Sequence, residues 1–363
     1  MDALRFVPSP ATFRVEEIPL YPPAGEGPHL WLVVQKRGID TLEARKRLGR
    51  RFQVPARDIG FAGRKDAAST AVQVFTVPWE VQGPLPGKNG RRSADSGLRI
   101  LSVSRHRHRL RVGHLAGNRF HVILRGDPRG AGRIAQRLRR ASREGFPNAF
   151  GPQRFGAAGR NVERGREVLL GIRRGERNRL SLWLSALQAA VFQAVLENRI
   201  RTGLHLREGD LLVASARRSG GVRARLEQAP SREVALRRGI LVPSGPLPGA
   251  RTPWAEGEMG RMERETASRL GWPHAPPRKI AGVRLDGQRR PLVVHPWGTR
   301  CTITRWGVHL AFALPAGSYA SALIRHLLGP RQGPSDRGNP GLYLPGSCLS
   351  PRPFCWALPG PGR

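Results

Sequence analysis

The large excess of positive charge is the feature that most limits what this chain can fold into. The sequence holds 62 Lys and Arg residues against 26 Asp and Glu residues, a formal net charge of +36. Such an excess repels itself in a compact state, and a bound polyanion is the simplest way to offset it. Acidic small molecules would not need so much charge, so the balance favours a nucleic-acid partner. Only five of the cations are lysine; because nucleotide composition alone can produce such an arginine bias, the inference rests on the net charge.

The rest of the composition indicates a folded protein, and the length favours two domains over one. Hydrophobic residues make up 39% of the 363 positions, which is enough to bury a core. Three cysteines, Cys301, Cys348 and Cys355, are too few and too scattered for a disulfide framework or a zinc ribbon, which favours a reducing compartment. The sequence has no run of about 18 apolar residues, and its start lacks the apolar core of a signal peptide. We therefore expect a soluble, cytoplasmic protein with no membrane partner.

Regular structure is expected in four segments of the first 80 residues. Residues 28–36 are β-branched and apolar, which predicts a strand, and Asp40 is expected to cap a short basic helix over 41–52. Residues 56–63 predict a buried strand that ends in a glycine turn, and 72–77 predict its neighbour. The segment between these two strands is then a loop, where chemistry tends to lie.

Two basic strands are expected next, over 99–112 and 119–125, joined by a turn at 113–118. In the second strand Phe120 shares one face with other apolar residues, and the opposite face is basic. Two interpretations stay open for this pair. It is either an RNA-binding surface that presents an aromatic side chain, or an ordinary amphipathic hairpin with Phe120 in the core.

The later part of the chain is expected to hold a separate unit, a return to the first domain and a tail. Apolar residues at helical spacing predict a helix over 180–200. Further strand and helix patterns occupy 308–314 and 319–328. Proline, glycine and charge predict an exposed loop over 79–98. The Gly- and Pro-rich residues 329–363 predict a disordered tail.

Several motifs of known chemistry can be excluded. Residues 83–88, GPLPGK, have one spacer too few for a phosphate-binding loop and lack the Ser or Thr that would hold Mg²⁺. His106 and His108 stand in a run of arginines that repels cations and offers no nearby carboxylate or cysteine. No GxSxG or HExxH motif occurs in the sequence. We therefore expect no metal site.

Asp66, in the loop between the two predicted strands, is the strongest candidate for chemistry. An aspartate in a turn is usually a surface cap. Asp66, however, is one of few acids in a strongly cationic chain, and it directly follows Arg64 and Lys65. Adjacent cations keep a carboxylate ionised, as a nucleophile or a general base requires.

This loop resembles AGxKDxxAxTxQ, the signature of the TruD family of tRNA pseudouridine synthases. The sequence supplies Ala62, Gly63, Lys65, Asp66 and Gln73. Six further segments match in the family's order, so that the resemblance covers about residues 8–328. These segments are Pro10-x-x-Phe13-x-Val15-Glu16-Glu17, Gly117-Asn118-x-Phe120, Pro147 to Gly156, Trp183 to Ala186, Ser244 to Gly249, and Leu314 to Ser321.

The resemblance implies a fold, a domain organisation and a reaction. The implied fold is α+β, a pseudouridine synthase-like antiparallel sheet core with helices. This catalytic domain would comprise residues 1–144 and 291–328, interrupted by a TRUD insertion domain over 145–290, with the tail outside both. The implied reaction converts a uridine of tRNA, typically position 13 in the D-arm, to pseudouridine without cofactor or metal. A monomer is favoured.

The resemblance also implies roles for individual residues. Asp66 matches the family's catalytic aspartate. Cleavage of the glycosidic bond, rotation of the detached uracil and rebonding through carbon need one carboxylate close to C1′ of a flipped-out uridine. Attack on C1′, attack on the uracil ring and abstraction of a ribose proton all stay open as routes. The residues expected to bind the substrate are Phe13, Lys65, Asn118, Phe120, Tyr319 and Arg325.

Two departures from the family pattern motivate an alternative. Val7 stands where the family usually has a lysine, so the cation near Asp66 must come from elsewhere, and we expect Arg325 on the last helix to supply it. Ser69 and Ala71 occupy the usual Ala and Thr positions of the loop. The alternative is a non-enzymatic RNA-binding or RNA-chaperone protein that keeps the same scaffold.

Overall fold

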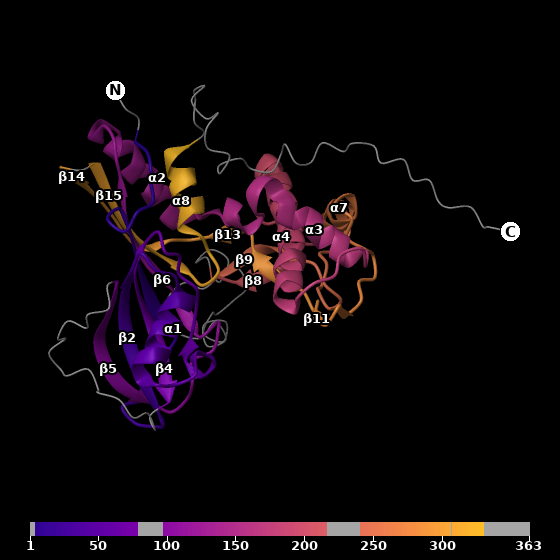
Figure 1. Ribbon diagram of the computed structural model, residues 1–363. Helices are drawn as coiled ribbons and strands as arrows, with labels where there is room; N and C mark the ends of the chain where they lie inside the picture. Colours follow the sequence, from indigo (N-terminus) through magenta and orange to yellow (C-terminus); the bar gives the residue numbers. More distant parts are fainter. Residues whose placement is uncertain (1–3, 79–96, 216–239, 306, 330–363) are drawn as a thin grey trace.

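A single large sheet organises the first part of the chain and its return near the end (Figure 1). The computed structural model describes residues 4–78, 97–215, 240–305 and 307–329. The sheet order is β14-β15-β6-β1-β4-β2-β5, with the short β3 beside β4. Every pairing in it is antiparallel except that of β1 with β4, which is parallel. The strands are β1 (Phe13–Pro19), β2 (His29–Arg37), β3 (Gly60–Phe61), β4 (Thr70–Pro78), β5 (Leu98–His106), β6 (Leu115–Leu124), β14 (Trp297–Thr304) and β15 (Gly307–Pro315).

Helices cover one face of this sheet in two separate places. Helix α1 (Thr41–Phe52) buries Ala44, Leu48 and Phe52 against the apolar residues of β2, β4 and β5. Helices α2 (Ala131–Glu144) and α8 (Ala320–Leu328) pack over β6 and β15 in a second, larger core. Burying apolar area of this kind is the main favourable contribution to folding. The strip of the same face between the two cores lies over β4, β1 and the start of β6.

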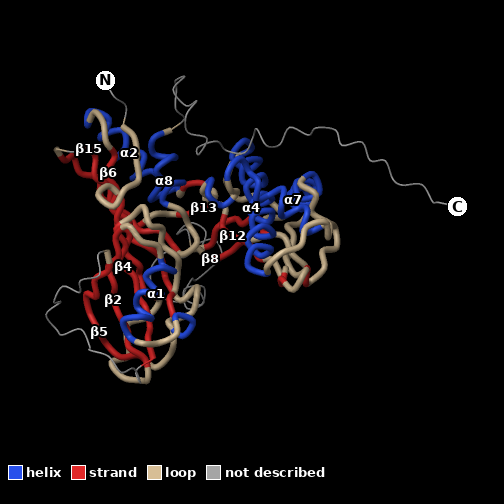
Figure 2. The backbone as a smooth tube through the Cα atoms, viewed as in Figure 1, coloured by secondary structure: helices blue, strands red, loops and turns tan. Residues whose placement is uncertain are grey.

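The middle of the chain forms a helical lobe beside the sheet (Figure 2). It contains α3 (Arg160–Leu169), α4 (Arg177–Thr202) and α7 (Gly257–Arg269), with a three-stranded sheet of order β12-β9-β8 and the pair β10–β11. The strands are β8 (Leu212–Ala214), β9 (Leu241–Leu247), β10 (Lys279–Ile280), β11 (Val283–Arg284) and β12 (Gln288–Pro291). By length and composition alone α4 could cross a membrane, but 61% of its most apolar window is buried inside the fold. In this structure α4 is the core helix of the lobe.

The two parts of the molecule join at a short antiparallel pair. β7 (Phe146–Pro147) leaves the end of α2 and pairs with β13 (Val293–Val294), just before the chain returns to the sheet. Four single-turn 3₁₀ helices complete the described elements, at Ala56–Asp58, Pro128–Gly130, Pro152–Arg154 and Ala157–Gly159. The division of the chain at residues 145 and 290 stays a prediction.

Most of the regular elements expected from the sequence are present. The strands at 28–36, 72–77 and 308–314 and the helices at 41–52 and 180–200 are confirmed as β2, β4, β15, α1 and α4. Asp40 caps α1 as expected, because its carboxylate accepts a hydrogen bond of 2.7 Å from the backbone N–H of Glu43. Helix α8 begins one residue after Tyr319. The mixture of sheet and packed helices confirms the α+β class, and the expected loop 79–98 and tail 329–363 lie almost wholly outside the described residues.

The prediction of a basic hairpin was wrong. β5 ends at His106 and pairs with β2, whereas β6 begins at Leu115, inside the expected turn, and lies between β1 and β15. The sequence pattern did not predict β1, because its two glutamates are not typical of a strand. β1 pairs with β6, so β5 cannot pair with β6 on that side. Phe120 is buried, as the core interpretation expected. The strand expected over 56–63 was also largely wrong, because Ala56–Asp58 form a 3₁₀ turn and only Gly60 and Phe61 lie in a strand.

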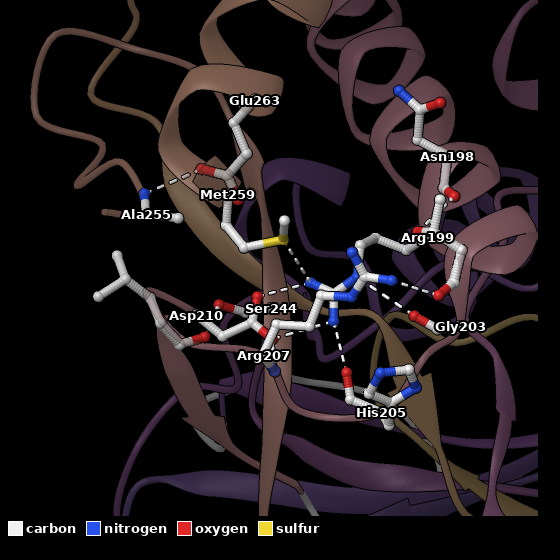
Figure 3. Close-up of polar contacts among 12 residues, drawn as sticks. Asn198, Arg199, Gly203, His205, Arg207, Asp210, Ser244, Ala255, Met259 and Glu263 are labelled. Carbon is white, nitrogen blue, oxygen red and sulfur yellow. Dashed lines mark hydrogen bonds and ion pairs between the residues drawn. The ribbon is translucent and has the colours of Figure 1, made fainter. Parts of the chain in front are cut away.

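A buried ion pair stabilises the helical lobe (Figure 3). Arg199, near the end of α4, donates hydrogen bonds of 2.5 and 2.9 Å to the two carboxylate oxygens of Asp210, and both side chains are almost fully buried. Arg199 also donates to the carbonyl of His205, and the backbone N–H of Arg207 donates to Asp210. This network connects the end of α4 to the loop that leads into β8.

We predict that Arg199→Met destabilises the protein by about 3–5 kcal/mol, because it leaves the carboxylate of Asp210 buried without a counter-ion. The double variant Arg199→Met with Asp210→Leu should recover most of this loss, since an apolar pair of similar volume has no charge to desolvate. Urea denaturation followed by far-UV circular dichroism measures both. A double variant as unstable as the single one would show that packing, and not the unpaired charge, dominates.

Candidate active site

The loop that carries Asp66 lies between β3 and β4, over the strip of the sheet that the helices leave uncovered. The backbone carbonyl of Asp66 accepts hydrogen bonds from Lys36 Nζ at 3.1 Å and Ser69 Oγ at 3.0 Å. The Asp66 side chain is exposed. Among the residues that the structure describes, none forms a hydrogen bond or ion pair with its carboxylate. The loop thus holds the backbone of Asp66 firmly and leaves its carboxylate free for a substrate.

Lys36, which sequence reasoning did not single out, is the main anchor of this loop. Its side chain is fully buried, and Nζ donates to the carbonyls of Ile39 at 2.6 Å, Lys65 at 3.0 Å and Asp66 at 3.1 Å. Burial lowers the pKa of Lys36 from 10.5 to about 8, although the nearby carboxylates of Asp40 and Asp66 act in the opposite direction. A buried ammonium with three carbonyl acceptors has its hydrogen-bonding capacity filled. The sequence signal that could have identified Lys36 was a charged residue near the end of an otherwise apolar strand.

Two uncharged side chains hold the rest of the loop. Thr41, the first residue of α1, accepts a hydrogen bond of 2.8 Å from the backbone N–H of Lys65 through its hydroxyl oxygen. The same hydroxyl donates to the side-chain oxygen of Gln73 at 2.8 Å, and the Gln73 amide donates to the carbonyl of Gly63 at 3.3 Å. Thr41 and Gln73 are both buried. The start of α1 and the middle of β4 therefore fix the loop from two sides.

Lys65 points into the protein and not toward solvent. Its ammonium lies 3.0 Å from a carboxylate oxygen of Glu17, and both side chains are almost fully buried. The second oxygen of Glu17 accepts a hydrogen bond from the backbone N–H of Val74. Burial raises the pKa of Glu17, and Lys65 and the bond from Val74 offset part of that rise. In this arrangement Lys65 joins the loop to β1, and its expected contact with substrate stays a prediction.

A row of polar side chains crosses the sheet beneath the loop. Asn118 on β6 lies directly opposite Glu17 on β1, and Gln73 continues the parallel register of β4 on the other side of Glu17. The Oδ1 atom of Asn118 is buried and has no hydrogen-bond partner among the described residues. An unsatisfied buried acceptor costs about 1–3 kcal/mol. Such an atom next to a candidate site indicates a position where a ligand donor can bind.

Two of the aromatic residues expected at the site, Phe13 and Phe120, lie in a stack that begins next to this row. The Phe13 and Phe120 rings are parallel, with centroids 6.0 Å apart, and Phe120 also contacts Phe312 at 5.4 Å. Phe120 is 6% exposed, whereas Phe13 is only partly buried. Phe120 therefore packs in the core next to Asn118, and its expected contact with substrate stays a prediction.

A second aromatic and basic group surrounds Tyr319 at the start of α8. The half-buried Tyr319 ring lies 5.8 Å from that of Phe150, and the guanidinium of Arg290 lies 4.2 Å from the Phe150 centroid. Arg290 also donates to Asn148 Oδ1 at 2.8 Å and to the carbonyl of Gly317 at 2.9 Å. Burial lowers the pKa of Arg290 to about 10, while Tyr319 acts in the opposite direction. Arg290 was not among the residues expected from the sequence.

The buried cation that contacts the Asp66 loop is Lys36. Arg325 lies on α8, half-buried, and burial lowers its pKa. The Nε atom of Arg325 is buried and unpartnered among the described residues. Val7 is 56% exposed, so it does not contribute to a buried contact near the loop. Lys36 therefore supplies a cation against the backbone of the loop. The expectation that Arg325 replaces the family lysine stays a prediction, as does its role toward substrate.

Within the described part of the chain, no cluster of three or more His, Cys, Asp or Glu residues could hold a metal ion. The loop offers one exposed carboxylate on a backbone held by buried contacts, and Asn118 adds an amide acceptor in the polar row of the sheet. Such a set suits chemistry by a single carboxylate on a bound base.

Comparisons with known proteins agree on one family. The family model described as tRNA pseudouridine synthase D (TruD) matches residues 5–171 and 160–327. A Geobacter sulfurreducens protein named tRNA pseudouridine synthase D is 34% identical, over 89% of this chain and 93% of its own. A Thermus thermophilus protein of the same name is 35% identical, over 88% and 87%. The crystal structure of a putative tRNA pseudouridine synthase D from Methanosarcina mazei has a TM-score of 0.66 at 18% identity, over 90% of this chain and 93% of its own, and shows the same fold.

We predict that Lys36→Met loosens the Asp66 loop without unfolding the protein. The substitution keeps the length of the side chain but removes the donor from three carbonyl oxygens, at about 1–3 kcal/mol for each that stays buried and unpaired. Amide hydrogen exchange over residues 63–69 should become at least tenfold faster. Lys46→Met, on the exposed face of α1, is the matched control and should leave exchange in the loop unchanged.

The same measurement has an expected pH dependence. Protection of the loop in the unchanged protein should fall as pH rises through about 8, because neutral Lys36 can donate to only two of its three acceptors. Between pH 8 and 10.5 the unfolded chain binds a proton at Lys36 that the folded chain does not, so this group makes folding more favourable as pH rises. Loosening above pH 8 with a melting temperature that does not fall fits this role of Lys36, and constant protection to pH 10 contradicts it.

Proposed function

Since the chain belongs to the tRNA pseudouridine synthase D (TruD) family, we propose that it isomerises a uridine of tRNA to pseudouridine. The observation that carries this proposal is the position of Asp66, whose carboxylate is exposed while Lys36, Thr41 and Ser69 hold the loop around it. We further propose position 13 in the D-arm as the modified nucleotide, with no cofactor or metal. The family model covers nearly the whole of the described chain, so the family assignment holds for both the sheet and the helical lobe.

The reaction needs one carboxylate and a pocket that holds the detached uracil in place. The bond from N1 of uracil to C1′ breaks, the ring turns, C5 bonds to C1′, and the proton from C5 is replaced by one at N1. The uridine must leave its stack first, which costs a few kcal/mol. Aromatic contacts and neutralised phosphates offset that cost. Asp66 acts at C1′, at the uracil ring or on a ribose proton; each route uses the same exposed carboxylate.

The other site residues bind and orient the flipped uridine in this proposal. The free Oδ1 of Asn118 accepts a hydrogen bond from the base or a ribose hydroxyl. Tyr319 and Phe13, which are both partly buried, supply aromatic walls, and Phe120 supports Phe13 from the core. Arg325 offers an unpartnered Nε to a phosphate. Lys65 acts through its ion pair with Glu17, which keeps the loop on the sheet.

A non-enzymatic RNA-binding or RNA-chaperone role is not favoured. Its motivation was Val7 in place of the family lysine, together with Ser69 and Ala71 in the altered loop. Lys36 supplies a cation against this loop, and the Ser69 hydroxyl donates to the carbonyl of Asp66. We keep a cytoplasmic location, a monomer, and a domain division at residues 145 and 290 as parts of the proposal.

Nucleoside analysis of unmodified tRNA transcripts incubated with the purified protein tests the function directly. Pseudouridine should form without added cofactor and in the presence of a chelator. The absence of pseudouridine from every tRNA of the source organism would overturn the proposal and restore the RNA-chaperone alternative.

We predict that Asp66→Asn abolishes turnover and changes the Kd for tRNA by no more than a few-fold. The amide keeps the shape of the side chain but cannot act as a base or nucleophile, and an exposed carboxylate contributes little to binding a polyanion. Single-turnover release of tritium from C5 of labelled uridine, together with a binding titration, measures both. An Asn variant with more than a tenth of the original rate would remove Asp66 from the catalytic role.

We predict that Tyr319→Phe keeps most activity and Tyr319→Ala loses it while the fold stays intact. Stacking on the uracil uses the ring face and is worth about 1–3 kcal/mol, so the hydroxyl is secondary. Rates measured alongside thermal melts decide between stacking and core packing. A Tyr319→Ala protein that melts far lower and recovers activity on cooling places the ring in the core, and an inactive Tyr319→Phe assigns the hydroxyl to the chemistry.

A further inference from the structure

A large basic pocket lies at the opposite end of β4 from the Asp66 loop. Its volume is about 970 Å³, and its lining includes Arg45, Arg107, Arg109 and Arg111 but no carboxylate. Residues 107–111 on its rim form the segment between β5 and β6 that was expected to continue a strand. Nothing in the proposed reaction at Asp66 uses this pocket.

Carboxylates near the pocket neutralise only part of its charge. Arg107 forms an ion pair with Glu26, and Asp58 interacts with Arg45. Arg109 donates to the backbone carbonyl of Arg57 and has no acidic partner in the described part of the chain. Arg111 is exposed, and no described residue forms a hydrogen bond or ion pair with its side chain. The pocket therefore keeps an excess of positive charge at neutral pH, where its arginines are protonated.

Rings and unpartnered nitrogen atoms line the same pocket. The Tyr21 ring stacks on that of His106, with centroids 5.2 Å apart, and the Tyr21 hydroxyl lies 2.8 Å from Nδ1 of His114. Arg45 Nε and His29 Nδ1 are buried and have no hydrogen-bond partner among the described residues. Burial lowers the pKa of His29 and of His106, which leaves neutral rings beside the arginines. Flat rings next to arginine forks and free polar atoms suit a base attached to a phosphate.

The pocket and the Asp66 loop lie at different positions along β4. Lys36, which contacts the Asp66 loop, is in register with Ala71, whereas Gly60 of the pocket is in register with Thr76. Five residues of extended strand correspond to about 16 Å. One nucleotide cannot occupy both places, so any nucleotide in the pocket is a different one.

We propose that this pocket binds a second, phosphate-bearing nucleotide of the RNA substrate, several nucleotides away from the uridine that reacts. The inference rests on the proposed function for the identity of the RNA. It assigns part of the charge of +36 to a defined place: the arginines of this pocket neutralise phosphates remote from the chemistry. Binding energy gained there is equal in the ground state and the transition state, so it lowers KM without changing kcat.

The test compares two double variants that remove the same charge. Arg109→Gln with Arg111→Gln changes the pocket, and Arg133→Gln with Arg139→Gln changes two exposed arginines on α2. For an unmodified tRNA transcript, the pocket variant should bind about tenfold more weakly, with a slope of log Kd against log salt that is shallower by about 1 to 2. Its KM should rise while kcat and the melting temperature stay unchanged, and the α2 variant should change little.

An RNA of three nucleotides centred on the uridine gives the decisive control, because it is too short to reach both places. The pocket variant and the unchanged protein should bind it equally. Equal weakening by both double variants on tRNA would reduce the effect to general charge, and an unchanged Kd for the pocket variant would remove the site. If the unchanged protein makes no pseudouridine but the Kd difference persists, the proposed function fails and the binding pocket stands.

Discussion

The candidate active site depends on the hydrogen bonds that the ammonium group of Lys36 donates to the backbone around Asp66. This ammonium is buried without a carboxylate in contact, and three backbone carbonyls satisfy it. Two of those carbonyls belong to Lys65 and Asp66, so the cost of burying the charge is offset by contacts that also set the path of the loop. The ion pair of Lys65 with Glu17 fixes the other side of the same turn. Preorganisation of this kind keeps a free carboxylate in one place before any substrate binds.

The sheet explains why this polar network can exist inside a protein. Its helices cover one face in two separate cores, one under α1 and one under α2 and α8. The strip between them is where Gln73, Glu17 and Asn118 lie side by side, and the loop packs over it. Gln73 bonds to Thr41 and to the loop, and Glu17 bonds to Lys65 and to the backbone of β4. The Oδ1 atom of Asn118 has no partner among the described residues. Apolar packing on both sides excludes water and strengthens the contacts between them.

Positive charge is divided between structural and binding roles. Arg199 and Arg290 are buried and bind protein groups, Asp210 in one case and Asn148 and Gly317 in the other. Arg109 and Arg111 line a large pocket with little acidic compensation. A net charge of +36 is therefore not a uniform property of the surface. In the proposed binding of RNA, the arginines that converge without carboxylates are the ones that contact a phosphate at a defined place.

The sequence by itself determined the family, the candidate catalytic aspartate and most of the regular elements, because these depend on local patterns: apolar periodicity in β2 and α4, the Asp40 cap, and the residues around Asp66. Tertiary structure alone decided which strands pair, since β1 and not β5 lies beside β6. It also decided which cation serves the loop. Lys36 and Asp66 are thirty positions apart, and only the pairing of β2 with β4 brings them together. Local patterns carry no information about such contacts, because strand order is set by packing across the whole sheet.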